Sequence, residues 1–155
     1  MPMTAVEEIA ARFGLHPHPG RGGWWAPGPR TRNLSSITYL LTDQTAGFAT
    51  MHRLGVDEGW RWLAGAPAAF LTLRPRSRGR LQPLTERDGE ILVKAGTWQG
   101  AASLGPWTLA ACWCSPAFTW SRFEAGEREA LATEYPDFAS EIAVLTPDSE
   151  PPELG

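Results

Sequence analysis

The sequence has few cysteines and no long apolar run. No apolar segment approaches the roughly 20 residues of a membrane-spanning helix, and the N-terminus lacks a basic stretch followed by an apolar one. The two cysteines, Cys112 and Cys114, lie on the same side of one strand-like stretch, where neither easily reaches the other. A Cys-x-Cys pair can ligate metal, but no second pair completes a zinc site. We therefore expect a cytoplasmic protein with no membrane partner, in which both thiols are reduced and packed.

Excess positive charge is also missing. The net charge is −3, from 14 basic and 17 acidic residues, which argues against a nucleic-acid partner because phosphate binding requires clustered Lys and Arg. The one basic cluster, Arg74, Arg76, Arg78 and Arg80, alternates with Pro, Ser and Gly. This pattern favours a solvated loop over an anion site.

Motifs of several large enzyme classes are absent as well. The sequence contains no nucleophile elbow, no glycine-rich phosphate loop ending in Lys-Ser or Lys-Thr, and no His-Glu-x-x-His helix. Hydrolase and nucleotide-dependent functions are therefore disfavoured.

Short β-rich runs dominate the middle of the chain, with helical patterns at both ends. Residues 4–13 predict a helix with Thr4 as N-cap and Glu7 as its capping-box partner, ended by Gly14. Residues 16–32 are rich in proline and glycine and predict an ordered arm, and residues 127–145 predict helical structure. Strands are predicted at residues 36–41, 47–54, 58–64, 68–73, 89–94, 99–103 and 108–114.

The close spacing of these strands indicates an all-β sandwich or barrel. A chain of 155 residues suits one domain. We therefore predict a single domain over residues 1–155, with its core at about 13–146 and a frayed tail from 147 to 155.

Eight tryptophans are many for this length. Because aromatic side chains bury large apolar areas, most are expected in the core or in a subunit interface. The others would line a pocket for a large, apolar or planar ligand.

Polar residues recur on one face of the predicted strands. Strand alternation points these side chains inward: Thr50, His52, Glu58, Trp60, Trp62, Thr97 and Gln99. A buried Glu beside a His forms an acid/base pair, so His52 could exchange a proton, Glu58 could orient it, and Gln99 could donate to a carbonyl oxygen. Alternatively, these groups only satisfy one another's hydrogen bonds. His16 and His18 are expected to face solvent or to anchor the arm.

The order of several short motifs resembles a known family. The matching segments are residues 17–19, 22–24, 35–41, 52–54, 57–58, 95–99, 115–118 and 134–136. Over residues 13–146 the chain is similar to a small single-domain cupin family of the cupin-5 type, which is related to dTDP-sugar epimerase-like cupins. The resemblance implies a double-stranded β-helix (jelly-roll) barrel with short flanking helices at the N- and C-termini, a homodimer, and a ligand cavity in the barrel mouth.

The resemblance also bears on metal binding. The general cupin pattern places a His-x-His pair, a Glu and a later His around one divalent ion. His52 and Glu58 match the first His and the Glu, but Leu54 and Gln99 stand where the other two histidines belong. A leucine is no ligand and an amide oxygen is a weak one. We therefore expect no cofactor, with a weak divalent-metal site at His52, Glu58 and Gln99 as the alternative.

Two further departures from the family pattern concern the cavity. Arg61 replaces a histidine, and strand alternation points it away from Glu58. Where relatives carry an Arg-Glu-Thr segment after Gly-Gly-Tyr, this chain has Trp24-Trp25-Ala26-Pro27, which predicts a less polar cavity. The expected substrate-binding residues are Trp60, Trp62, Thr50, Thr97, Tyr39, Trp24 and Trp25.

These expectations lead to a functional hypothesis. We expect a small-molecule-binding cupin that acts as a metal-independent isomerase, epimerase or cyclase on a largely apolar metabolite, in a tailoring step of secondary metabolism. The catalytic residues would be His52, Glu58 and Gln99. The alternatives are a non-catalytic ligand-binding cupin and a metal-dependent oxygenase.

Overall fold

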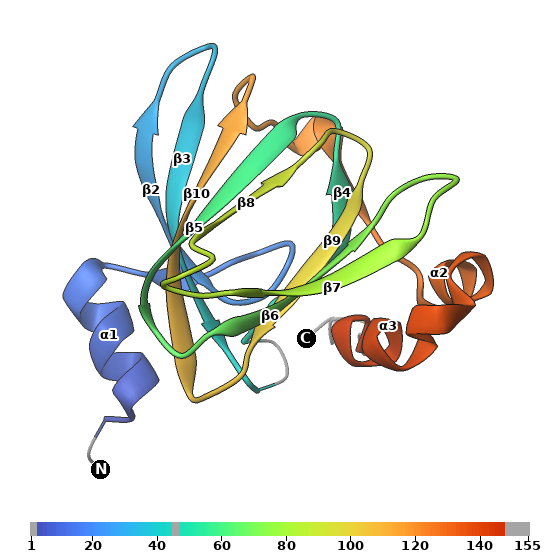
Figure 1. The fold of residues 1–155 in the computed structure, drawn as a ribbon. Helices are drawn as coiled ribbons and strands as arrows, with labels where there is room; N and C mark the ends of the chain where they lie inside the picture. Colours follow the sequence, from blue (N-terminus) through green and yellow to red (C-terminus); the bar gives the residue numbers. More distant parts are fainter. Residues whose placement is uncertain (1–2, 45–46, 148–155) are drawn as a thin grey trace, which may run out of the picture.

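Two antiparallel sheets and a few short helices make up the fold (Figure 1). The computed structural model describes residues 3–44 and 47–147. The first sheet has the order β1 (His16–Pro17), β2 (Trp24–Arg30), β3 (Ser35–Thr42), β10 (Trp107–Ser115), β5 (Asp57–Gly65) and β8 (Glu90–Val93). The second has the order β11 (Phe123–Ala125), β4 (Ala49–Leu54), β9 (Trp98–Ser103), β6 (Ala68–Leu73) and β7 (Gly79–Leu84). The predicted all-β class is confirmed.

The central core lies between the two sheets. Its largest side chains are Tyr39 from β3, Trp60 from β5 and Phe70 from β6, all fully buried. The ring centroids of Tyr39 and Trp60 are 5.4 Å apart, and those of Trp60 and Phe70 are 5.1 Å apart. Because these rings fill the middle of the sandwich, space for a ligand has to lie elsewhere.

The helices cover the outer faces of both sheets. Helix α1 (Ala5–Phe13) has the predicted capping box of Thr4 and Glu7, and Gly14 ends it in the left-handed conformation. It contributes Ala10 to a cluster with Leu40 and Leu109 of the first sheet. A 3-10 turn at Trp120–Arg122 and strand β11 precede helix α2 (Arg128–Glu134). A second 3-10 turn at Pro136–Phe138 leads directly into helix α3 (Ala139–Leu145). Their buried side chains pack on the second sheet: Leu131, Ile142 and Leu145 with Met51, Leu71 and Leu73.

Four strands were not predicted. Strands β1 and β2 lie within the arm, where β1 pairs only with Trp24 and Trp25 of β2. Beyond that pairing the outer edge of β2 has no partner strand in the described part of the chain, so Pro27 and Pro29 fit there without loss of a ladder hydrogen bond. Strand β11 is only three residues long and has no strand pattern of its own.

Strand β7 corrects the expectation for the basic cluster. Arg74, Arg76 and Arg78 lie exposed between β6 and β7, as expected of a solvated loop, whereas Arg80 lies within β7. The remainder of the expected frayed tail, residues 148–155, lies outside the described residues. Among the residues that are described, no helix has the length and apolar character needed to cross a membrane.

Candidate functional site

A cavity of about 550 Å³ opens beside the first sheet. The arm, strands β2, β3, β5 and β10, and the segment 118–123 after β10 all contribute to its lining. Four aromatic side chains, here called the aromatic collar, belong to this lining: Trp25, Phe118, Trp120 and Phe123. The Trp120 ring centroid lies 5.1 Å from that of Phe118 and 5.3 Å from that of Phe123, both in edge-to-face geometry. The collar therefore presents packed aromatic surface to the cavity.

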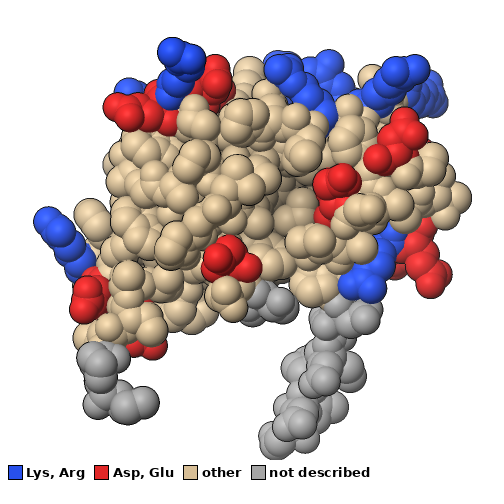
Figure 2. Space-filling view, turned by 60° about the horizontal axis from the view of Figure 1, so that its bottom comes forward, with Lys and Arg blue, Asp and Glu red and all other residues tan. Residues whose placement is uncertain are grey.

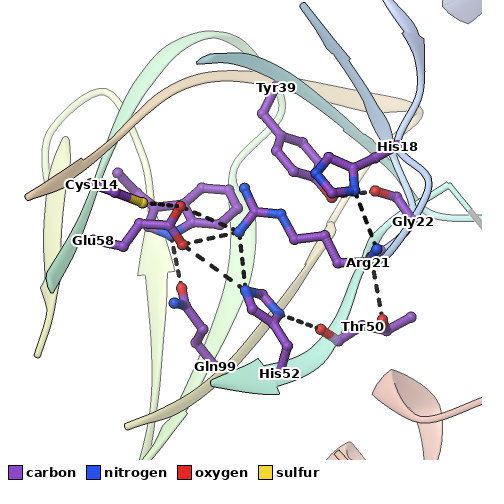
Figure 3. A network of polar contacts seen from close by, with 10 residues as sticks. His18, Arg21, Gly22, Tyr39, Thr50, His52, Glu58, Gln99 and Cys114 are labelled. Atoms are coloured by element: carbon purple, nitrogen blue, oxygen red, sulfur yellow. Dashed lines mark hydrogen bonds and ion pairs between the residues drawn. The ribbon is translucent and has the colours of Figure 1, made fainter. Parts of the chain in front are cut away.

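Arg21 holds the polar residues together below the collar (Figure 3). Its Nη1 donates to Glu58 Oε1 at 3.0 Å and Oε2 at 3.3 Å, and to His52 Nε2 at 3.0 Å. The guanidinium carbon also lies 4.5 Å from the Tyr39 ring centroid and 5.2 Å from that of Trp60. Arg21 comes from the arm and reaches into the barrel with only 4% of its surface exposed. It thereby fastens the arm to the barrel interior.

The ion pair fixes the charge states of these groups. Burial alone would raise the pKa of Glu58, but the positive charge of Arg21, together with its hydrogen bonds, lowers it to about 2. Burial alone would lower the pKa of Arg21, but Glu58 raises it above its ordinary value. Burial, more than any other cause, lowers the pKa of His52. At neutral pH the site therefore contains a charged Arg21–Glu58 pair and a neutral His52.

The hydrogen bonds of His52 determine its tautomer. Its Nδ1 lies 2.7 Å from the Thr50 carbonyl oxygen, which can only accept, so Nδ1 carries the proton. Its Nε2 accepts from Arg21 and lies 4.0 Å from Glu58 Oε1. His52 is fully buried and is not part of the cavity lining. Its free electron pair therefore faces Arg21.

A second histidine lies between the arm and the cavity. The Nδ1 atom of His18 accepts from the backbone amides of Gly20 at 3.2 Å and Arg21 at 3.3 Å, and its ring stacks on Tyr39 at 5.7 Å. Burial, followed by the charge of Arg21, lowers the pKa of His18 to about 3. His18 is therefore neutral with its proton on Nε2. It anchors the arm, as the sequence suggested, and also lines the cavity.

Two further polar contacts complete the interior. The Trp60 indole donates to Gln99 Oε1 at 2.9 Å, so the amide oxygen already has a partner. The Cys114 thiol contacts Glu58 Oε2 at 3.5 Å. Cys112 and Cys114 are both buried free thiols, as expected, and burial raises the pKa of each. Both line the cavity.

The structure divides the predicted site residues into two groups. It brings together His52, Glu58, Gln99, Trp60, Tyr39 and the Thr50 backbone, and it places Trp25 in the collar. Of all the predicted residues, only Glu58 and Trp25 line the cavity. Trp24, Trp62 and Thr97 also lie apart from the polar cluster around Arg21. Trp24 packs with the cluster under α1, Trp62 borders a separate depression with Pro67, and Thr97 lines a groove beside β7 and β8.

Sequence reasoning missed Arg21 and most of the collar. Arg21 lies among prolines and glycines with no periodicity, so nothing in the sequence indicated which way it points. The spacing of Phe118, Trp120 and Phe123 was an available aromatic signal. Arg61 is exposed, in agreement with the alternation argument.

The donor set does not fit a divalent metal ion. The Arg21 Nη1 atom lies 3.0 Å from both His52 Nε2 and Glu58 Oε1, so a guanidinium occupies the position between the two retained ligands. The Gln99 oxygen accepts from Trp60, and Leu54 offers no donor atom. Within residues 3–44 and 47–147, no three His, Cys, Asp or Glu side chains are arranged to hold a metal ion.

Comparisons with known proteins show the family. The model of the Cupin superfamily (DUF985) family matches residues 7–126, and the chain belongs to this family. A Shewanella oneidensis protein of known crystal structure is 26% identical, with a TM-score of 0.80, over 92% of this chain and 98% of that chain. A hypothetical protein from Leishmania major is 24% identical, with a TM-score of 0.75, over 93% of this chain and 97% of that one.

Likeness at the level of the fold extends further. Oxalate decarboxylase from Bacillus subtilis has a TM-score of 0.60 at 15% identity, over 88% of this chain and 38% of that chain. At this identity the likeness concerns the fold alone. No curated protein matches the sequence. The expected cupin barrel with short terminal helices is thereby confirmed.

Proposed function

We propose that this cupin binds a small, largely apolar and planar molecule between the residues of its aromatic collar. The observation that carries the proposal is the cavity of about 550 Å³ walled by Trp25, Phe118, Trp120 and Phe123. Its volume lies within the range of roughly 300–1,000 Å³ common for small-molecule sites, which are lined mainly by apolar and aromatic groups. Flat aromatic walls favour a flat ligand because offset and edge-to-face ring contacts add to simple burial.

The charges below the collar favour a neutral ligand. The charges of Arg21 and Glu58 cancel, and His18 and His52 are neutral at physiological pH. Below the collar, a charged ligand would therefore lose its hydration without meeting a compensating net charge. Arg30, the further charged residue of the lining, is exposed, and its Nη2 donates to the Phe118 carbonyl oxygen at 2.7 Å. The Glu58 carboxylate can accept a hydrogen bond, and the His18 Nε2–H can donate one. These two groups would orient a neutral ligand that carries a hydroxyl or carbonyl group.

Metal-independent isomerase, epimerase or cyclase chemistry is the second candidate function. The observation in its favour is that one ionised carboxylate, Glu58, and one thiol, Cys114, contact each other and both line the cavity. A carboxylate with a pKa of about 2 is a weak base, and the electron pair of His52 faces Arg21. Any catalysis would therefore depend mainly on how the walls fold the substrate, with the Glu58 carboxylate assisting as the hydrogen-bond acceptor that orients it. Under this second candidate, the protein would carry out a tailoring step in secondary metabolism and would be related to the sugar epimerases.

Ligand binding is tested first on the purified protein. Native mass spectrometry detects a co-purifying molecule, and saturation-transfer NMR with 2-naphthol, cyclohexanol and glucose ranks planar, non-planar and polar probes. We expect 2-naphthol to bind best, and Trp120→Ala to weaken its binding by about tenfold, the usual scale for one aromatic contact. The matched control is Trp62→Ala, because this indole lies outside the cavity. Equal losses in both variants, or no preference for 2-naphthol, would contradict the proposal.

Catalysis requires a separate measurement. Once a natural ligand is identified, its incubation with the wild-type protein in D₂O, followed by NMR, reports proton exchange or rearrangement. The isomerase candidate predicts a change that Glu58→Gln slows. A ligand that remains bound and unchanged would exclude this candidate and leave the binding function standing.

A further inference from the structure

A second groove lies where the two sheets end side by side. Strand β7 is the last strand of the second sheet and β8 is the last strand of the first. Both line a groove of about 360 Å³, which is separate from the aromatic cavity. We call it the basic groove, for the four cations described next. Neither edge has a further partner strand among the described residues.

Four basic side chains line one end of this groove: Arg74, Arg78, Arg80 and Lys94. They meet there because of strand register. Leu73 at the end of β6 pairs with Gly79 of β7 on one side and with Trp98 of β9 on the other. Arg74 directly follows β6, and Arg78 and Arg80 flank the first residue of β7. Lys94 directly follows β8, shortly before β9 begins. All four cations therefore gather at this end of the sheets. Residues scattered over 21 positions of the loop-rich sequence thus become neighbours.

Negative charge does not balance these cations. Glu90 is the one acidic residue in the groove lining, and it begins β8, four residues before Lys94. At about 3.3 Å per residue this separation is about 13 Å. Lys94 lies 3.3 Å from the exposed Asp57, but in the described part of the chain the three arginines form no ion pair. On the face seen in Figure 2, most of the visible basic side chains lie along the upper edge, where some acidic side chains accompany them.

The groove also contains a threonine hydroxyl that is open to a ligand. Thr97 lines the groove with only 6% of its surface exposed. Its backbone amide donates to the Lys94 carbonyl at 3.1 Å. Its side-chain hydroxyl forms no hydrogen bond within residues 3–44 and 47–147 and is not fully buried. Thr72, Ser77 and Gln82 add further polar side chains to the lining.

We propose that the basic groove binds the phosphate group of a small phosphorylated molecule. Guanidinium groups donate paired hydrogen bonds that match phosphate oxygens, and a hydroxyl such as that of Thr97 supplies a further donor. The volume suits a phosphate with a small organic group attached. This site is independent of the aromatic cavity. It gives the arginine cluster a binding role, which its sequence pattern alone did not favour.

Calorimetric titration with inorganic phosphate and pyrophosphate, at constant ionic strength set with NaCl, tests the proposal. We expect saturable binding of pyrophosphate that Arg78→Ala and Arg80→Ala each weaken by about tenfold, the scale of one charge-assisted hydrogen bond. Thr97→Val should weaken it too, while Thr97→Ser should not. The matched control is Arg76→Ala, which removes the same charge from the same loop at a position outside the groove lining.

Three results would overturn the proposal. One is the absence of saturable binding by the wild-type protein. Another is an equal loss for Arg76→Ala and Arg78→Ala, which would indicate general charge screening. The third is that the arginine variants aggregate without any change in pyrophosphate affinity, which would show that the cations only protect the sheet edges. Trp120→Ala should leave pyrophosphate binding unchanged. The phosphate-binding proposal can therefore fail independently of the proposal that the aromatic collar binds a ligand.

Discussion

Replacement of Arg21 by methionine removes a buried charge and keeps most of the length of the side chain. The Glu58 carboxylate would then lie 2% exposed without its cation. Removal of one partner of a buried ion pair costs about 3–5 kcal/mol. The pKa of Glu58 gives a similar figure, because its fall from 4.5 to about 2 corresponds to about 3 kcal/mol. We therefore expect Arg21→Met to lower the free energy of unfolding by about 3–5 kcal/mol at pH 7.

The loss should depend on pH in a defined direction. In the wild type the folded pKa of Glu58 lies below its unfolded value, so the stabilisation is complete above about pH 4.5 and disappears as the pH falls towards 2. In Arg21→Met the burial of Glu58 is uncompensated, and its pKa should rise above 4.5. The variant should therefore be most impaired at neutral pH. The difference from wild type should shrink as the pH falls below 4.5.

Urea unfolding followed by tryptophan fluorescence between pH 3 and 8 measures both effects. Urea is preferable to guanidinium, since a free guanidinium ion could occupy the vacated position. The double variant Arg21→Met with Glu58→Gln removes both charges and should recover most of the lost stability, because a buried pair can often be replaced by neutral groups at little cost. A loss that does not change with pH, or no recovery in the double variant, would refute the reasoning.

Three further predictions concern the metal, the thiols and the packing of the first sheet. After incubation with Fe²⁺, Mn²⁺, Ni²⁺ or Zn²⁺ and desalting, elemental analysis should find far less than one ion per chain, and a stoichiometric ion would contradict the role given to the guanidinium. Because burial raises the pKa of Cys112 and Cys114, Ellman's reagent at pH 8 should react at least about tenfold faster in urea than with the native protein, and equal rates would disprove this. Gly59→Ala would place a Cβ 2.1 Å from the Trp113 ring and should lower the free energy of unfolding, measured in urea, by about 1–3 kcal/mol. Gly89→Ala, whose Cβ would have its nearest contact at 3.4 Å, should leave this free energy unchanged.

The arm shows where local patterns stop being informative. Its prolines and glycines excluded a helix, but they carry no alternation that says which side chains point inward. The contact of Arg21 with Glu58 spans 37 residues of sequence, and it exists because the arm pairs with β3 and turns Arg21 into the barrel. The position that a metal would take between His52 and Glu58 was therefore visible in the sequence, while the side chain that fills it was not.

Thr97 illustrates a different limit. Alternation assumes that a strand continues in phase, but Gly96 lies at a positive φ of 84° just before β9 begins at Trp98. The change of direction places Thr97 just before the start of β9, where it lines the basic groove. Gln99, two residues later and within the strand, faces the interior as alternation required.

The sequence alone determined the all-β class, seven of the strands, the capped N-terminal helix, the resemblance to cupins and the inward direction of His52, Glu58 and Gln99. The resemblance depends on the order of short motifs. The other features follow from periodicity and capping, which depend on residues close together in the chain. Only the tertiary structure decided that Arg21 lies between His52 and Glu58, that segment 118–123 completes an aromatic collar, and that the arginines meet at the end of two sheets. These features depend on which distant segments pack together, and local spacing carries no information about that.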